Sequence, residues 1–259
     1  MTQPLPFTAL LLAHRNDQRL SKAVESVSCA KHVIIGWSGE SLSEREKETL
    51  RQLHSDLTIV EQNGPIVDFA HTRNALHSYA KTDWVFWLDS DETLHAESVD
   101  ALAQALSRQD LAGATIQRRD VFHGRELHWG EVRKVRILRL FKHPAGKFIR
   151  PVHEVAHVDG RVEELPIVIS HFAHESLSSF LAKVAQYAAI EAEHRYLADK
   201  RAGVIELLTW PMGKFVHNLL IKQGWRDGWR GLSYATMMSL HSLCVRVFLR
   251  EKHLGKHDV

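Results

Sequence analysis

The sequence has little cysteine and no leader-like apolar start. Its 259 residues include two cysteines, Cys29 and Cys244, which lie far apart and form no metal-type or redox spacing. This excludes a disulfide scaffold and favours a reducing compartment. Pro4, Pro6 and Arg15 interrupt the N-terminal apolar segment, so no signal peptide is expected.

Long apolar runs are also absent from the sequence. No uninterrupted stretch reaches the roughly 20 apolar residues that a membrane-spanning helix needs. The best candidate, residues 205–221, contains Glu206, Pro211, Lys214 and His217. We therefore expect a cytoplasmic protein.

A strong excess of charge of one sign is missing. The net charge is +2, with 44% apolar and 25% charged residues, as in ordinary globular proteins. This small charge, with no recognisable motif, disfavours nucleic-acid binding. Residues 172–259 are more basic, with 12 Lys and Arg against 8 Asp and Glu, and Trp210, Trp225 and Trp229 lie among the basic residues. Two interpretations stay open: peripheral contact with an anionic inner membrane, or helices that pack on protein.

Histidine is abundant, with 18 residues, but its spacing does not indicate zinc. The pairs His153/His157 and His171/His174 have neither cysteine partners nor a His-Glu-x-x-His helix beside them. Most of these histidines are expected to bind no metal.

The most informative segment that is present runs from Trp84 to Glu92. Five apolar residues lead directly into the carboxylates of Asp89, Asp91 and Glu92. Such a run predicts a buried strand, and ligands bind at the carboxyl ends of strands in open α/β sheets. Clustered carboxylates are commonly stabilised by a divalent cation. The alternative is a surface loop in which Asp91 or Thr93 caps the next helix.

Strands and helices alternate in the first 110 residues, which indicates βαβ units and a parallel sheet. Ser43 and Glu46 have capping-box spacing, and Asp68 is a plausible helix N-cap. The expected strands cover residues 8–13, 32–35, 57–60 and 84–89, and the expected helices cover residues 17–28, 43–54, 68–80 and 96–107.

The pattern changes after residue 110. Short strands are expected at residues 114–118, 135–141, 152–158 and 165–169, and helices from about Leu177 onward. This gives an α/β catalytic domain over residues 1–171, with halves 1–110 and 111–171, and a helical C-terminal extension over residues 172–259.

Five motifs in order resemble glycosyltransferase family 2, in particular its branch that builds lipopolysaccharide core. They are the Arg-Asn helix at 68–76, the acidic strand at 82–92, Arg-Leu-Phe at 139–141, Pro-Val-His-Glu at 151–154 and Lys-Gln-Gly-Trp-Arg-Asp-Gly at 222–228. The resemblance implies a GT-A fold, which is a Rossmann-like nucleotide-sugar domain with a mixed sheet, followed by a helical C-terminal extension.

The resemblance also implies roles for individual residues. Asp89 and Asp91 would hold Mg²⁺ or Mn²⁺ at the donor diphosphate, and Glu154 would be the general base that takes the acceptor proton. His153 would contact either the metal or the acceptor. Asn74 is expected to secure the local fold, and Glu92 is a weaker candidate for a site role. The expected nucleotide-sugar contacts are Ala13, Trp37, Arg73, Asp89, Ser90 and Arg139.

One position departs from the family pattern. The family's second strand ends in an Asp that helps to hold the nucleotide base, whereas this chain has Gly36 or Trp37 there. Trp37 could stack on a base, the donor could be unusual, or nucleotide binding could be lost. These alternatives stay open.

Together the resemblance implies an inverting, metal-dependent glycosyltransferase. It would move a hexose from a nucleoside-diphosphate sugar to a hydroxyl of a bacterial envelope glycolipid, with lipopolysaccharide core as the expected acceptor. One alternative is an inactive sugar-nucleotide-binding relative. Another is a haloacid-dehalogenase-type phosphatase, because residues 89–93 also spell Asp-x-Asp-x-Thr.

Overall fold

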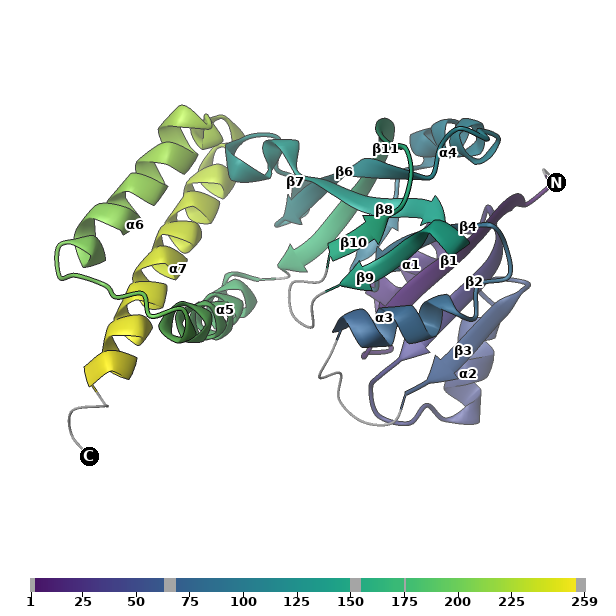
Figure 1. Cartoon of the computed structure of the whole chain (residues 1–259), viewed down its shortest axis with the longest axis horizontal. Helices are drawn as coiled ribbons and strands as arrows, with labels where there is room; N and C mark the ends of the chain where they lie inside the picture. The colour runs from purple at the N-terminus through teal and green to yellow at the C-terminus, as the bar shows by residue number, and fades with distance from the viewer. Residues whose placement is uncertain (1–2, 63–68, 150–154, 175, 255–259) are drawn as a thin grey trace. The chain divides into compact units, whose positions relative to one another are not determined.

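The computed structural model describes residues 3–62, 69–149, 155–174 and 176–254. It divides into two compact units, which are described separately (Figure 1). The first unit comprises Met1–Arg118 and Arg136–His171. The second comprises Phe172–Val259 together with the inserted segment Arg119–Val135.

The first unit begins with alternating strands and helices and continues with antiparallel strands. In chain order its elements are β1 (Leu5–Ala13), α1 (Gln18–Ser26), β2 (Ala30–Trp37), α2 (Glu44–Arg51), β3 (Leu57–Glu61), α3 (Phe69–His77), β4 (Trp84–Asp89), β5 (Glu92–Leu94), η1 (Ala96–Ser98), α4 (Val99–Leu106), β6 (Gly113–Phe122), β8 (Arg136–Lys142), η3 (His143–Ala145), β9 (Gly146–Ile149), β10 (Val155–Val158) and β11 (Val162–His174).

The sheet is mixed, as the sequence predicts. Its strand order is β3-β2-β1-β4-β8-β6-β11-β5. The first four strands are parallel, whereas β8 is antiparallel to both β4 and β6, and β11 is antiparallel to β5. Strands β9 and β10 form a separate antiparallel pair. The carboxyl ends of β1, β2, β3 and β4 therefore meet at one edge of the sheet.

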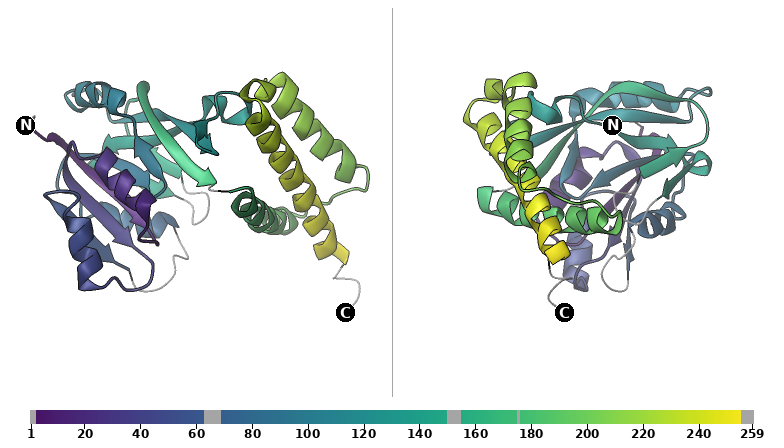
Figure 2. Two further views of the ribbon diagram at one scale, coloured as in Figure 1. Left: turned by 180° about the vertical axis from the view of Figure 1, so that it is seen from behind. Right: turned by 60° about the vertical axis from the view of Figure 1, so that its left-hand side comes forward.

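Both faces of the parallel half are covered. Because side chains alternate along a strand, Phe7, Ala9 and Leu11 of β1 face one way and Leu10 and Leu12 face the other. The first set packs with α1, α2 and α4, and the second packs with α3 and the β9–β10 pair. Figure 2 (left) shows α1 in front of the sheet, opposite the side that carries α3 in Figure 1.

The structure confirms most of the predicted elements. The side chain of Asp17 caps α1, and Ser43 with Glu46 forms a complete capping box on α2. The alternative in which Asp91 or Thr93 caps a helix is wrong. Residues 92–94 instead form β5, because β11 supplies hydrogen-bond partners from nearly 80 residues further along the chain, which no local pattern reveals.

The second unit is mainly helical. Its elements are the end of β6, β7 (Arg125–Glu126), η2 (Gly130–Lys134), α5 (Leu177–Leu197), α6 (Glu206–Val216), the π-helical turn η4 (His217–Ile221), η5 (Gly224–Asp227) and α7 (Trp229–Leu254). The inserted segment belongs to this unit because its apolar side chains pack on the helices. Phe122, Leu127 and Val132 share a buried cluster with Phe180 of α5 and Tyr234 of α7.

One described helix, α7, is long and apolar enough to cross a membrane by length and composition alone. This differs from the expectation that residues 205–221 are the best candidate. Ser, Thr and His residues interrupt the apolar run of α7, but they lower its mean hydropathy little, so α7 forms no uninterrupted apolar stretch. In the most apolar 18-residue stretch of α7, 28% of the stretch is buried within the protein.

Glycine is required where α7 meets the preceding turn. A Cβ atom at Gly231 would lie 1.8 Å from the backbone oxygen of Gly224, and backbone cannot move aside as a flexible side chain can. We expect Gly231→Ala to destabilise the protein by about 1–3 kcal/mol or more, measured by urea unfolding. Gly213→Ala, where a Cβ meets no atom within 4 Å, is the matched control and should not destabilise. Equal stability of the two variants would contradict the close approach.

Candidate active site

The candidate site lies at the edge where the parallel strands end. Leu12 of β1 is in register with Asp89 at the end of β4, and Ala13 is in register with Trp37 at the end of β2. The chain leaves β4 through Ser90 and Asp91 and immediately re-enters the sheet at β5. This short turn places the three acids of the motif within one small region.

Asp89 is fixed between two arginines. Nη2 of Arg73 donates to its Oδ1 at 2.7 Å, and Nη2 of Arg139 donates to its Oδ2 at 2.6 Å. Arg73 comes from α3 and Arg139 from β8, so the sequence elements predicted to form the site do meet there. Both carboxylate oxygens of Asp89 are thus engaged by guanidinium groups.

Glu92 lies beneath this cluster and has no solvent-exposed surface. Its Oε1 accepts from Nη2 of Arg139 at 3.2 Å, and its Oε2 accepts from the backbone N–H of Asp89 at 3.0 Å. The carboxylate of Glu92 therefore fixes both the arginine and the backbone at the end of β4. The sequence ranked Glu92 as a weaker candidate, and the structure places it as a support of the site.

The two carboxyl groups have opposite pKa shifts. Burial alone would raise the pKa of Asp89, but the positive charges of Arg139 and Arg73 outweigh it and hold this pKa far below its usual range. For Glu92, burial raises the pKa, and Arg139 counteracts this only in part. Asp89 is therefore ionised at neutral pH.

Arg73 is itself buried, with only 3% of its surface exposed. Its guanidinium carbon lies 5.0 Å from the centre of the Trp87 ring and 5.2 Å from the centre of the Phe148 ring. Cation–π contacts and the ion pair therefore hold the side chain in one position. The predicted helix N-cap, Asp68, lies outside the described residues.

Asn74, next to Arg73, ties α3 to β9. Its Nδ2 donates to the backbone oxygen of Phe148 at 2.9 Å, and its Oδ1 accepts from the backbone N–H of the same residue at 2.8 Å. The prediction that Asn74 secures the local fold is confirmed. Because Phe148 also lies against Arg73, this pair of hydrogen bonds helps to hold the arginine.

Trp37 lies in the core rather than on an open surface. Only 4% of it is exposed, and its Nε1 donates to the backbone oxygen of Glu40 at 2.7 Å. A ring buried to this degree offers little area on which a base could stack. Ala13 is also buried, and its backbone oxygen accepts from the backbone N–H of Ser38, whereas Ser90 is partly exposed in the turn.

Asp91 differs from its neighbours because no arginine is bound to it by an ion pair among the described residues. About a quarter of its side chain, 24%, is exposed, and its Oδ1 lies 3.8 Å from Nε2 of His171. Partial burial of the ring and the charges of Arg15 and Arg19 lower the pKa of His14, and Asp91 acts in the opposite direction. Asp91 thus lies near two histidines.

Sequence reasoning missed these two histidines as parts of the site. His171 lies on β11, in register with Glu92 of β5, and His14 directly follows β1. The end of a predicted strand could have indicated His14. No local signal could have indicated His171, because only the pairing of β11 with β5 brings it to the acids.

The residues present fit a divalent cation that is shared with a ligand. Among the described residues, no group of three or more His, Cys, Asp or Glu side chains could hold a metal ion. Mg²⁺ commonly takes only one or two protein carboxylates and completes its shell with phosphate oxygens and water. The oxygens of Asp91 suit this arrangement, whereas both oxygens of Asp89 already accept from arginines. Two other predicted residues, His153 and Glu154, lie outside the described residues.

The arginine cluster predicts a pH-dependent effect of removing Asp89. A carboxyl group whose folded-state pKa is lowered contributes stability above its unfolded pKa, here 3.8, and loses it as the pH falls through the folded value. Asp89→Asn should therefore lower the free energy of unfolding by a constant amount from pH 7 down to about pH 4. Urea unfolding at several pH values measures this, and a difference that disappears already between pH 7 and 5 would contradict the lowered pKa.

Comparison with known proteins identifies the family. Residues 14–159, more than half of the chain, match the sequence profile of Glycosyl transferase family 2. The chain belongs to this family. The match covers α1 through β10 and therefore includes every element that carries the acids and arginines described above.

A curated glycosyltransferase is similar along the whole length. The lipopolysaccharide core biosynthesis glycosyltransferase LpsC of Rhizobium meliloti (strain 1021) is 24% identical over 264 aligned residues, which cover 99% of this chain and 96% of LpsC. The resemblance to the lipopolysaccharide core branch is thus supported over both units.

Two solved structures share the fold. TarS 1-349 of S. aureus has a TM-score of 0.50 at 12% identity. The superposition covers 97% of this chain and 92% of the TarS chain. GalNAc-T7, solved with UDP, GalNAc and Mn²⁺, has a TM-score of 0.51 at 11% identity. The superposition covers 65% of this chain and 43% of the GalNAc-T7 chain. The predicted GT-A fold with a helical C-terminal region is confirmed.

Proposed function

We propose that this glycosyltransferase moves a hexose from a nucleoside-diphosphate sugar to a hydroxyl of a bacterial envelope glycolipid, with inversion at the anomeric carbon. Lipopolysaccharide core is the proposed acceptor, and the similarity to LpsC over 99% of the chain supports it. The observation that carries the proposal is the cluster at the end of β4, where two arginines fix Asp89 beside the partly exposed Asp91.

The residues of the cluster have different proposed tasks. Asp91 would bind Mg²⁺ or Mn²⁺ together with the donor diphosphate, because its negative charge is not matched by an arginine among the described ion pairs. The cation would stabilise the charge that develops on the leaving nucleoside diphosphate. Arg73, Arg139 and Glu92 would hold Asp89 in one rotamer, from which its carboxylate can orient the donor.

The proton on the acceptor hydroxyl must be removed during a single displacement. Glu154 stays the predicted general base, and His153 stays a predicted metal or acceptor contact, both from their place in the Pro-Val-His-Glu motif. Strand β10 begins at the residue after Glu154. A carboxylate is a suitable base when it lies within hydrogen-bond reach of the attacking hydroxyl.

Peripheral contact with the inner face of an anionic inner membrane is part of the proposal. Large apolar side chains are exposed in the second unit on and around α6, among them Ile205, Leu208, Trp210 and Met212. Such side chains near basic residues suit a bilayer interface, where a lipid-linked acceptor would be met. The proposed site of action is accordingly the cytoplasm, on the inner face of the inner membrane.

A donor screen tests the function. The protein is incubated with Mn²⁺, a candidate acceptor and each of several nucleoside-diphosphate sugars, and release of nucleoside diphosphate is measured. One donor should be turned over, and Glu154→Gln should abolish transfer while donor binding persists. Metal-dependent donor binding without turnover would instead favour the inactive relative.

The phosphatase alternative does not fit this chain. It requires the first acid of the motif as a free nucleophile, whereas two guanidinium groups occupy the oxygens of Asp89. The chain also belongs to a glycosyltransferase family.

A further inference from the structure

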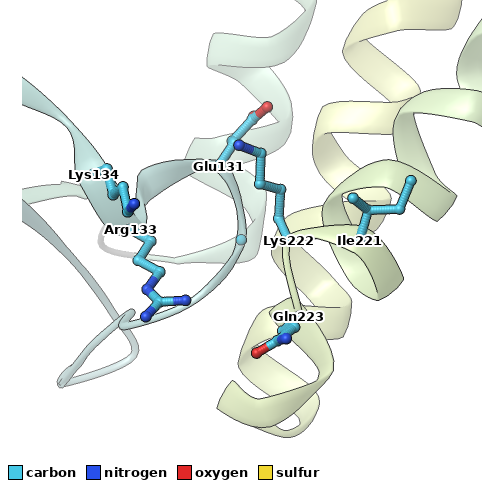
Figure 3. Close-up of a pocket in the computed structure, with 7 residues that line it drawn as sticks. Glu131, Arg133, Lys134, Ile221, Lys222 and Gln223 are labelled. Carbon is cyan, nitrogen blue, oxygen red and sulfur yellow. The ribbon is translucent and has the colours of Figure 1, made fainter.

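A basic pocket lies in the second unit. Its cavity of about 230 Å³ is lined by two segments, residues 130–134 of η2 and residues 221–223 at the end of the π-helical turn η4. Figure 3 shows Arg133 and Lys134 on the first segment and Lys222 on the second. Three cationic side chains therefore line one small cavity.

The acids near this pocket are already engaged. Glu131 forms an ion pair with Lys214 at 2.5 Å. Asp227 accepts hydrogen bonds from the backbone N–H groups of His128 and Trp129. The charges of Lys134 and Lys222 are matched by no carboxylate among the described ion pairs.

Two arginines add positive charge beside the cavity. The guanidinium carbons of Arg133 and Arg226 lie 4.0 and 3.8 Å from the centre of the Trp129 ring. The ring of Trp129 thus holds both guanidinium groups by cation–π contacts. The arrangement is therefore suited to a negatively charged ligand.

The backbone around the cavity is unusual in three places. Residues 217–221 form a π-helical turn. Such turns are rare in proteins overall, but many of them occur at functional sites. Gln223 has a φ of 59°, a left-handed conformation that is costly for a residue with a side chain. Gly130 is also left-handed, with a φ of 80°, and its N–H donates to the backbone oxygen of Lys222.

Asn218 fixes this backbone from within. It is 1% exposed, and its Oδ1 accepts from the backbone N–H of Glu131 at 3.0 Å. A Cβ atom at Gly130 would lie 2.6 Å from this same oxygen. The two pocket segments are thus joined by hydrogen bonds that hold the basic side chains on a fixed frame.

We propose that this pocket binds a phosphate group carried by a saccharide. The proposal deepens the proposed function, because a phosphorylated saccharide acceptor would present such a group to the second unit. Lys222 and Arg133 would donate charge-assisted hydrogen bonds to the phosphate oxygens, and Lys134 would add a further charge.

Calorimetry with glucose 6-phosphate tests the proposal, using the full chain in EDTA and without donor. Unphosphorylated glucose is the ligand control. Binding is expected for glucose 6-phosphate only and should weaken about tenfold in Lys222→Gln and in Arg133→Gln. Lys222→Arg should retain binding. Lys200→Gln, an exposed site in the same unit, is the matched control and should bind as the unchanged protein does.

Three outcomes would overturn the proposal: no binding of glucose 6-phosphate, binding that none of the pocket variants weakens, or equal binding of glucose. Binding to phosphatidylglycerol vesicles is measured in a separate experiment. If Lys222→Gln and Arg133→Gln abolish vesicle binding while the unchanged protein does not bind glucose 6-phosphate, the pocket binds lipid headgroups instead. Because donor and metal are absent, the result does not depend on whether the chain transfers sugar.

Discussion

Asp91→Asn is expected to lower metal-dependent turnover by on the order of 100-fold or more while the melting temperature changes little. Asparagine keeps the size of the side chain but loses the negative charge that would hold the cation at the donor diphosphate. The side chain is partly exposed and is bound to no arginine by an ion pair among the described residues, so the fold does not depend on it. Release of nucleoside diphosphate at saturating donor measures the effect.

Asp159→Asn provides the matched control for this prediction. Asp159 is exposed in the same unit, and its carboxylate also lies near a histidine, His157. The control should keep full turnover. If Asp91→Asn keeps full turnover as well, Asp91 does not hold the metal. A shift of its activity toward higher Mn²⁺ concentrations would support the assignment further.

The second large effect is expected for Arg139→Met. This change leaves Glu92, which has no exposed surface, without its ion-pair partner and removes one of the two arginines from Asp89. Removing one partner of a buried ion pair is strongly destabilising, and the expected loss in the free energy of unfolding is about 3–5 kcal/mol. Urea unfolding monitored by circular dichroism measures it.

The effect of Arg139→Met should depend on pH. Burial raises the folded-state pKa of Glu92 above its unfolded value of 4.5, and losing Arg139 raises it further. A carboxyl group with a raised pKa lowers stability as the pH rises above its unfolded value. The destabilisation should therefore be largest near neutral pH and shrink as the pH falls toward 4.5.

Two further variants distinguish a buried charge from lost packing. Arg136→Met changes the same residue type on the same strand, but Arg136 is exposed, so a loss of at most about 1 kcal/mol is expected. Adding Glu92→Gln to Arg139→Met removes the unpaired charge and should recover part of the loss. If Arg139→Met were no worse than Arg136→Met, the buried pair would not support the site.

The local elements could be read from the sequence. The capping residues Asp17 and Ser43, the apolar run into Asp89 and the alternation of strands and helices each depend on neighbours within a few residues. The same local motifs indicated the family, because Arg73, Asp89 and Arg139 stand in short recognisable segments. The fold class and most candidate residues were therefore predictable.

The partners of those residues were not predictable. Arg73 and Arg139 stay predicted donor contacts, and the structure adds that both bind Asp89. The ring of Trp37, offered for base stacking, is buried. The contact of Arg139 depends on the pairing of β8 with β4, and that of Arg73 depends on the packing of α3 against the sheet. The membership of residues 119–135 in the second unit depends likewise on packing against α5 and α7.

The sequence by itself determined that acids follow a buried strand, that an Arg-Asn helix precedes it, and that the chain belongs among family 2 glycosyltransferases. Only the tertiary structure decided which of the two aspartates forms ion pairs with arginines and which forms none among the described residues. Asp89 and Asp91 are two residues apart and chemically identical. They differ because β8 and α3 bring arginines to Asp89, while β11 brings His171 to Asp91.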